Sequence, residues 1–168
     1  MKKNNNICAG LYTKKVLETF KNPKNYGRIK NADGIGKVGN IVCGDLMQLY
    51  IKIGRNRKKE EIIKDIKFET FGCVAAISTS STITDLVKGK TINQALKIEK
   101  NSIIKKLGGL PKIKYHCSVL AVDALTEAIF DYFSKNEKEI PLEILERHEK
   151  IKREREIIEE RYKNLEKR

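Results

Sequence analysis

The sequence predicts one α+β domain, in which a short helix is followed by strands and then by a block of helices. Two segments, residues 47–53 and 62–70, carry apolar side chains at every second position, as half-buried strands do. After Cys73 the apolar spacing changes to three and four residues, which is typical of amphipathic helices. Strands and helices in separate blocks indicate an α+β fold. At 168 residues the chain is long enough for one modest core.

The first element is a short amphipathic helix over residues 12–20, which ends in the turn-rich residues 22–27. Residues 31–45 follow, and their glycines match the pattern G-x-G-x-x-G from Gly34 to Gly39. A dinucleotide-binding loop follows a strand and opens a helix, whereas this segment follows a polar turn and precedes a strand pattern. We therefore do not expect it to bind phosphate.

The strand pattern over residues 47–53 is separated from that over residues 62–70 by a polar turn at residues 54–60. Two strands joined by a short polar turn predict an antiparallel hairpin.

The helices come next. One is expected to end at Lys88-Gly89, where the glycine provides a C-terminal stop, and Thr91 is expected to open a short one. A further helix should end at Leu107, before a pair of glycines. A loop over residues 110–115 then leads to His116-Cys117, and the longest core helix follows at residues 119–132.

The composition changes near residue 135, so we divide the chain into a flexible arm (1–11), a domain (12–134) and a charged helical extension (135–168). Four apolar residues recur every seven positions in the extension: Ile144, Ile151, Ile158 and Leu165. The second core position of each heptad is not apolar, so a coiled coil is not predicted. We expect a charged helix that is partly detached or rests on another subunit, or else a fully solvated helix. His148 is expected on the surface.

The net charge of +13 suggests an anionic partner, but its distribution argues against nucleic acid. The extension carries only +1, and the first 134 residues carry +12 as scattered lysines. Only 8 of the 35 basic residues are arginine and there is no Trp, whereas nucleic-acid binders favour Arg and aromatic side chains. An acidic protein partner explains the charge at least as well. The sequence shows neither a membrane span nor a signal peptide, so we expect a cytoplasmic protein.

The four cysteines, Cys8, Cys43, Cys73 and Cys117, contain no Cys-x-x-Cys pair, which argues against a zinc ribbon and a thioredoxin-like motif. A disulfide framework is not expected in a chain of this kind. Burial as small apolar residues is the simplest alternative. Three of the four, however, lie where one predicted element meets the next, beside Asp45, Gly72 and His116.

Cys73 and Cys117 directly precede predicted helices, and a helix N-terminus lowers the pKa of a thiol. Together with Asp45 and His116, the thiolates would form a set of soft ligands and one harder ligand, which suits zinc or an iron-sulfur cluster. A Cys-His-Asp nucleophile uses the same residue types, and the spacing does not separate these possibilities. A mixed ligand set should hold a cluster less firmly than four thiolates, and we expect such a site at the solvent edge.

The chain resembles the IscU/NifU-type iron-sulfur cluster assembly scaffolds over about residues 12–134. The resemblance rests on short runs that occur in the family's order and spacing: Asn22-Pro23, Asn31-Ala32-Asp33-Gly34, Cys43-Gly44-Asp45, Lys67-Phe68, Thr70-Phe71-Gly72-Cys73, Val87-Lys88-Gly89-Lys90, Gly108-Gly109-Leu110-Pro111 and His116-Cys117-Ser118. It implies a small three-stranded antiparallel sheet with helices packed mainly on one face.

The resemblance implies a scaffold and sulfur acceptor and not a conventional enzyme. A cysteine desulfurase would pass sulfur to Cys117, iron would enter, and a labile [2Fe-2S] cluster would form on Cys43, Cys73 and Cys117. Asp45 or His116 would complete the ligand shell, and recipient apoproteins would take the cluster. The alternative is a zinc-binding sulfur acceptor of the related SufU-like type, and zinc is also possible in the isolated scaffold. The zinc-binding branch typically lacks a histidine before its third cysteine, so His116 favours the IscU/NifU-type scaffold over the SufU-like alternative.

Two departures from the family pattern stand out. Val74 replaces the small residue that usually follows the second cysteine, and its branched side chain should stiffen a loop at the edge of the cluster. The family's binding motif for an Hsp70-type chaperone, which acts with a J-protein, has a second proline that this chain lacks. The matching residues here are Leu110, Pro111, Ile113 and Lys114. Cys8 lies outside the resemblance and is assigned no role.

Overall fold

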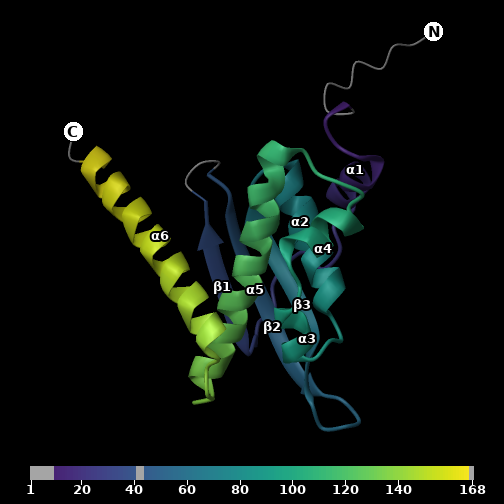
Figure 1. Ribbon diagram of the computed structural model, residues 1–168, viewed down its shortest axis with the longest axis vertical. Helices are drawn as coiled ribbons and strands as arrows, with labels where there is room; N and C mark the ends of the chain where they lie inside the picture. Colours follow the sequence, from purple (N-terminus) through teal and green to yellow (C-terminus); the bar gives the residue numbers. More distant parts are fainter. Residues whose placement is uncertain (1–9, 41–43, 167–168) are drawn as a thin grey trace.

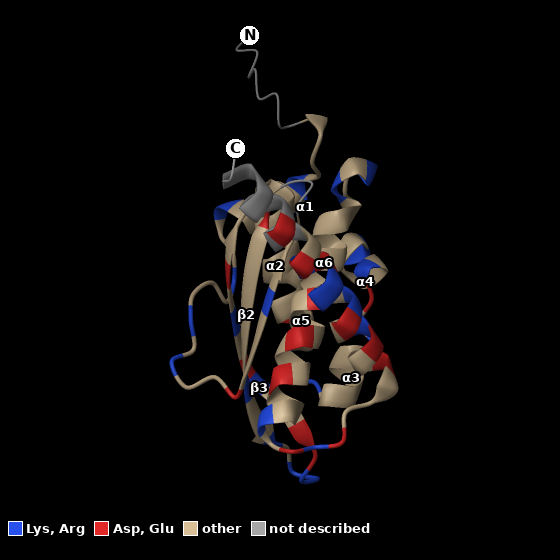
Figure 2. Ribbon diagram, turned by 90° about the vertical axis from the view of Figure 1, so that its left-hand side faces the viewer, with Lys and Arg blue, Asp and Glu red and all other residues tan. Residues whose placement is uncertain are grey.

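A computed structural model describes residues 10–40 and 44–166, and it contains one three-stranded antiparallel sheet in the order β1-β2-β3 (Figure 1). The strands are β1 (Gly34–Gly39), β2 (Leu46–Arg55) and β3 (Glu61–Phe71). The helices are α1 (Lys14–Lys21), α2 (Val74–Val87), α3 (Ile92–Leu96), α4 (Lys100–Lys106), the 3-10 turn η2 (Lys112–Lys114), α5 (Tyr115–Lys135) and α6 (Leu142–Glu166). Figure 2 shows the helices layered against one face of the sheet. The predicted α+β fold is confirmed.

The β2–β3 hairpin follows the predicted alternation. Met47, Leu49 and Ile51 of β2 are buried, and so are Ile66 and Phe68 of β3. The register pairs Leu49 with Phe68 and Ile51 with Ile66, so these side chains form one apolar face beneath the helices. A β-bulge between Lys52 and Ile53 shifts the register near the turn. Both strands extend the predicted segments by one or two residues at each end.

Strand β1 was not predicted from the residue pattern, because it lies within the glycine-rich segment. Its glycines allow a helix to approach closely. A Cβ atom on Gly36 would lie 2.0 Å from the Ala124 carbonyl oxygen of α5, and one on Gly34 would lie 2.1 Å from that of Ala128. Two glycines on one face of a strand thus fit two alanines one turn apart on a helix. The G-x-G pattern of Gly34 and Gly36 therefore allows β1 to pack closely against α5.

The predicted helix boundaries in the middle of the chain are confirmed. Helix α2 ends at Val87, and Gly89 follows with φ +81°. Helix α3 begins after Thr91, whose side chain accepts a hydrogen bond from the Gln94 backbone N–H while the Gln94 side chain bonds back to Thr91. None of the described helices is long and apolar enough to cross a membrane.

The prediction that His116 and Cys117 lie in a loop is wrong. Helix α5 begins at Tyr115, immediately after the 3-10 turn η2, so both residues belong to its first turn. Pro111 precedes η2 and fixes the entry of the chain into the turn. The consequence is that the Cys117 side chain is held by a regular helix packed on the sheet.

Helix α6 is not detached from the domain. Its Ile144 and Ile151 are 3% and 8% exposed and join the hydrophobic core beside α5. Arg147 donates a hydrogen bond to Asp123 of α5 over 2.7 Å. In Figure 1 its lower part lies along α5, and its C-terminal end points away from the sheet. The expectation of a partly detached or solvated helix is therefore wrong, because Ile144 and Ile151 pack beside α5 of the same chain.

The expectation that His148 lies on the surface is also wrong. Its ring stacks on Phe130 of α5 with 3.7 Å between ring centroids. Its Nδ1 lies 2.8 Å from the carboxylate of Glu127, whose side chain is 7% exposed. Burial raises the pKa of Glu127, and the contacts with His148 and Arg155 act in the opposite direction. His148 thus anchors α6 to a buried carboxylate.

Replacing His148 with alanine should lower the free energy of unfolding by about 1–3 kcal/mol, because a buried carboxylate loses a hydrogen-bond partner. Urea unfolding followed by circular dichroism measures this. Lys152→Ala, an exposed substitution on the same helix, is the control and should stay within about 0.5 kcal/mol of the parent. Equal stability of the two variants would show that α6 is not anchored through His148.

Candidate functional site

The candidate site lies where β2 begins, β3 ends and α5 begins. Leu46 pairs with Phe71 in the sheet, so Asp45 and Gly72 sit next to each other just beyond the last pair. Cys73 is the N-cap residue of α2, as predicted. The first turn of α5 crosses this end of the hairpin and adds Cys117. The antiparallel register and one helix therefore bring together residues that are far apart in the chain.

Two sulfurs and one carboxylate face one another in this site. The Sγ atoms of Cys73 and Cys117 are 3.8 Å apart. Oδ2 of Asp45 lies 3.8 Å from the Cys73 sulfur and 3.6 Å from the Cys117 sulfur. The backbone N–H of Cys73 donates to Oδ1 of Asp45 over 3.3 Å and so orients the carboxylate. All three side chains thus point at a common volume.

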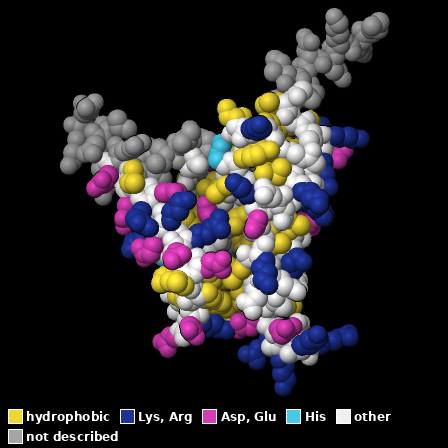
Figure 3. Space-filling model, in the orientation of Figure 1, with side chains coloured by type: hydrophobic (Ala, Val, Ile, Leu, Met, Phe, Trp, Pro, Cys, Tyr) yellow, Lys and Arg dark blue, Asp and Glu magenta, His cyan; other side chains and the backbone are white. Residues whose placement is uncertain are grey.

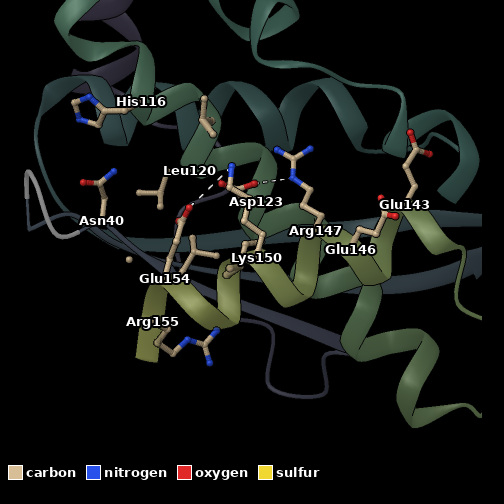
Figure 4. Close-up of a pocket in the computed structure, with 14 residues that line it drawn as sticks. Asn40, His116, Leu120, Asp123, Glu143, Glu146, Arg147, Lys150, Glu154 and Arg155 are labelled. Atoms are coloured by element: carbon tan, nitrogen blue, oxygen red, sulfur yellow. Dashed lines mark hydrogen bonds and ion pairs between the residues drawn. The ribbon is translucent and has the colours of Figure 1, made fainter. Parts of the chain in front are cut away.

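His116 supplies a nitrogen to the same group. The possible ligand atoms of Asp45, His116 and Cys117 all lie within 4.8 Å of one another. Nε2 of His116 is buried and has no hydrogen-bond partner among the described residues. Figure 4 shows the His116 side chain at one end of a cleft of about 540 Å³ between α5 and α6. A buried imidazole nitrogen without a partner is costly unless something binds it.

The spacing of the donors suits a tetrahedral metal. With metal–sulfur bonds of about 2.3 Å, two sulfurs at tetrahedral corners stand roughly 3.8 Å apart. The separation of the two sulfurs is 3.8 Å. A set of sulfur, carboxylate and imidazole donors fits zinc or iron and fits magnesium or calcium poorly. The site has the donors and the spacing for a soft or borderline metal.

The Cys73 thiol is activated. A hydrogen bond from Cys117 lowers the pKa of Cys73 to about 6, with further help from the backbone N–H of Ala76 and the charge of Lys114. Burial and the Asp45 carboxylate oppose this shift. The charge of the Cys73 thiolate in turn raises the pKa of Lys114. Cys73 is therefore a thiolate at neutral pH, which is the form that binds metal and attacks sulfur.

The alkylation rate of Cys73 by iodoacetamide should rise with pH through a midpoint near 6 and level off above 7. The alkylation rate of an ordinary cysteine has its pH midpoint at about 8.5. The measurement uses metal-free protein in which Cys8 and Cys43 are replaced by serine. Adding Cys117→Ala removes the hydrogen bond and should move the midpoint upward. A midpoint at 8 or above in the parent would contradict the activation of Cys73.

The expectation of a solvent-edge site is wrong for two of its residues. Cys117 is 0% exposed and Asp45 is 3% exposed, whereas Cys73 is partly exposed. Cys117 is buried because it lies on the inner face of α5, where Thr79 of α2 donates a hydrogen bond to its carbonyl oxygen. Of this group, Cys73 and His116 are the residues that are partly exposed to solvent.

Comparison with known proteins identifies the family. The model of the NifU-like N-terminal domain matches residues 11–139. The chain belongs to this family.

Curated relatives of the family are similar over most of the chain. The protein named iron-sulfur cluster assembly scaffold protein IscU 1 from Archaeoglobus fulgidus is 59% identical over 128 residues, which are 76% of this chain and 80% of that protein. The IscU scaffold protein of Aquifex aeolicus is 44% identical over 124 residues, 74% of this chain and 77% of its own length. The crystal structure of the N-terminal part of a NifU-like protein from Brucella abortus has a TM-score of 0.55 at 22% identity, and the likeness covers 73% of this chain and 94% of that one. It supports the fold.

The remaining residues singled out in the sequence fall into three groups. Cys43 lies outside the described residues. Val74 is the first residue of α2 and packs partly against the core, so it belongs to a helix and not to a loop. In the segment matching the chaperone motif, Leu110 is buried and Ile113 is exposed, and Lys114 is the residue whose charge acts on Cys73.

The sequence motif around Gly72 did not predict a role for this residue. A Cβ atom at this position would lie 2.8 Å from Oδ1 of Asp45 and 2.9 Å from Cβ of Ala76. Glycine therefore leaves the space that the carboxylate needs beside the Cys73 N–H. A glycine directly before a cysteine at the start of a helix suggests that a side chain would not fit there. Only the packing shows that the Asp45 carboxylate is the group that needs the space.

Proposed function

We propose that this chain is an iron-sulfur cluster assembly scaffold. It accepts sulfur from a cysteine desulfurase, binds iron, builds a labile [2Fe-2S] cluster and passes the cluster to recipient apoproteins. The observation that carries the proposal is the convergence of two sulfurs and a carboxylate within 3.8 Å, beside an imidazole nitrogen without a partner among the described residues. The names of the relatives support the same role.

In this proposal the cluster ligands are Cys43, Cys73 and Cys117, and Asp45 or His116 completes the set. Iron and the cluster are cargo that the scaffold assembles and gives up. A carboxylate or imidazole ligand exchanges more readily than a thiolate on iron, which suits a site that must release its cluster. The protein acts in the cytoplasm as a scaffold and sulfur acceptor and not as an enzyme with turnover of its own.

Cys117 is the proposed sulfur acceptor. Its thiolate attacks the outer sulfur of the desulfurase persulfide, a new sulfur–sulfur bond forms on Cys117, and the desulfurase thiolate leaves. Reduction of the transferred sulfur to sulfide takes two electrons from an external reductant. His116 is the neighbouring base that takes the thiol proton. Because the Cys117 sulfur is buried, transfer requires the site to open when the desulfurase docks.

Exposed apolar residues next to the site support docking by partners. Phe71 and Ile113 are 78% and 75% exposed, and Leu46 and Tyr115 are also exposed. Figure 3 shows hydrophobic side chains gathered at the upper end of the molecule, where α5 begins. Exposed apolar clusters commonly mark interaction surfaces. We propose that the desulfurase docks here, and that an Hsp70-type chaperone with its J-protein binds residues 110–114.

Anaerobic reconstitution tests the scaffold function. Purified protein incubated with iron, cysteine, a cysteine desulfurase and a reductant should develop visible absorption. Cys43→Ser should lose this chromophore, and Cys8→Ser, the matched control outside the site, should keep it. Absence of a chromophore in the parent would refute the proposal.

A second candidate is a zinc-loaded sulfur acceptor, because the tetrahedral spacing of the donors suits zinc as well. Metal analysis of protein purified without added iron, together with a desulfurase activity assay, distinguishes the two. Stoichiometric zinc, strong stimulation of the desulfurase and no cluster on reconstitution would favour the second candidate.

A further inference from the structure

The densest group of positive charges lies in the turn between β2 and β3. Arg55, Arg57, Lys58 and Lys59 fall within five consecutive residues, and all four are exposed. Only three arginines occur in the first 134 residues, and this turn holds two of them. Figure 1 shows the turn extending below the rest of the molecule, and Figure 3 shows Lys and Arg side chains gathered at this lower end. We call these four residues the basic turn.

The backbone of the basic turn is held in place by Asn56. The side-chain oxygen of Asn56 accepts hydrogen bonds from the backbone N–H groups of Lys58, at 2.9 Å, and Glu60, at 3.0 Å. The backbone N–H of Asn56 donates to the Glu60 carbonyl oxygen over 3.0 Å, and that of Lys59 donates to the Asn56 carbonyl oxygen over 2.9 Å. Such a turn displays its side chains from a fixed frame, which lowers the entropy lost on binding.

One nearby carboxylate offsets part of this charge, because Glu61 pairs with Arg55 across the two strands and the charge of Arg55 helps to lower the pKa of Glu61. Glu60 accepts a hydrogen bond from the Asn56 side chain over 2.8 Å. Glu61 bonds to the Tyr132 hydroxyl and to Lys138. Within the described part of the chain, none of the four cations has a carboxylate within 4.0 Å. The positive field of the turn is therefore concentrated at Arg57, Lys58 and Lys59.

The basic turn is at the opposite end of the hairpin from the cysteine site. Strand β2 runs ten residues from Leu46, beside the site, to Arg55, where the turn begins. At about 3.3 Å per residue the two ends are about 30 Å apart. A partner bound at the turn therefore leaves the cysteine site open, so both can be occupied at once.

We propose that the basic turn is a docking surface for an acidic segment of a partner protein. Charge complementarity identifies the occupant. The turn has no aromatic side chain on which a base could stack, as single-stranded nucleic acid binding requires. It also has no apolar side chain to insert into a membrane surface. A run of Asp and Glu residues needs only the cations. This surface goes beyond the proposed scaffold function and does not depend on it.

Binding of a fluorescein-labelled deca-glutamate peptide to the metal-free full chain tests the proposal by fluorescence anisotropy. The test variant replaces Arg55, Arg57, Lys58 and Lys59 by glutamine. The control variant replaces four exposed lysines on α3 and α4 and their flanks by glutamine: Lys97, Lys100, Lys105 and Lys106. Both variants lose four charges, and both keep Asn56 and Glu60, so the turn remains formed. The double variant Arg57→Gln/Lys58→Gln repeats the test with a smaller change.

The expected result is a loss of affinity of about tenfold in the test variant, and less than about twofold in the control variant, in 0.1 M NaCl. Equal losses in the two variants would overturn the proposal, because net charge alone would then explain binding. Oligothymidine and phosphatidylglycerol vesicles are measured in parallel. Tighter, turn-dependent binding of either probe than of the peptide would also overturn it. Cluster assembly plays no part in these measurements, so failure here leaves the scaffold function untouched.

Discussion

Replacing Gly36 with alanine is expected to lower the free energy of unfolding by about 3 kcal/mol, at the upper end of the usual range for overpacked sites. The new Cβ atom would lie 2.0 Å from the Ala124 carbonyl oxygen and 2.6 Å from the Ala128 backbone nitrogen. Both are backbone atoms of α5, so no side-chain rotation relieves the overlap. Either β1 leaves the helix or α5 shifts, and α5 carries Cys117. Urea unfolding measures the loss.

Gly10→Ala is the control for this prediction, because a Cβ atom there meets no atom within 4 Å. It should change stability by less than about 0.5 kcal/mol. If Gly36→Ala unfolds at the same urea concentration as the parent, the close packing of β1 on α5 does not exist in solution.

Replacing Asp45 with alanine is expected to lengthen the lifetime of an assembled cluster by about tenfold, which corresponds to about 1.4 kcal/mol. The carboxylate lies within 3.8 Å of both sulfurs, so its charge repels the thiolates. It also offers an oxygen ligand that exchanges readily. The measurement follows the decay of visible absorption after a chelator is added under anaerobic conditions.

Asp85→Ala is the matched control, because Asp85 pairs with Lys24 on the surface and should leave the decay rate unchanged. A second readout needs no cluster. Asp45 raises the pKa of the Cys73 thiol, so Asp45→Ala should move the alkylation midpoint of Cys73 below that of the parent. Faster decay of the cluster in Asp45→Ala would show that the carboxylate is a required ligand.

Most of the fold could be predicted from local patterns. The period-two segments gave β2 and β3, and the cap at Thr91 gave the start of α3. Strand β1 could not be predicted in this way, because its glycines are explained only by Ala124 and Ala128 on a helix almost a hundred residues later. The packing of α6 against α5 could not be predicted for a similar reason. Its isoleucine repeat marks an apolar face without identifying the surface that covers it.

The sequence predicted which residue types form the site. It predicted their burial and their neighbouring groups only in part. The neighbours of Cys73 and Cys117 indicated activated thiols, and the pKa of Cys73 agrees. Burial of Asp45 could not be predicted, because it follows from the register that places Gly72 beside the carboxylate. The same limit applied to His148, whose partners Glu127 and Phe130 lie on another helix.

The distance along the chain between the site residues affects how the protein is made. Asp45 and Cys117 face each other although 72 residues separate them. During synthesis β2 and β3 leave the ribosome first, and the hairpin can form on its own strands. The sulfur of Cys117 arrives only when α5 has been synthesised and has docked. The complete ligand set proposed above therefore exists only in molecules that have completed their fold.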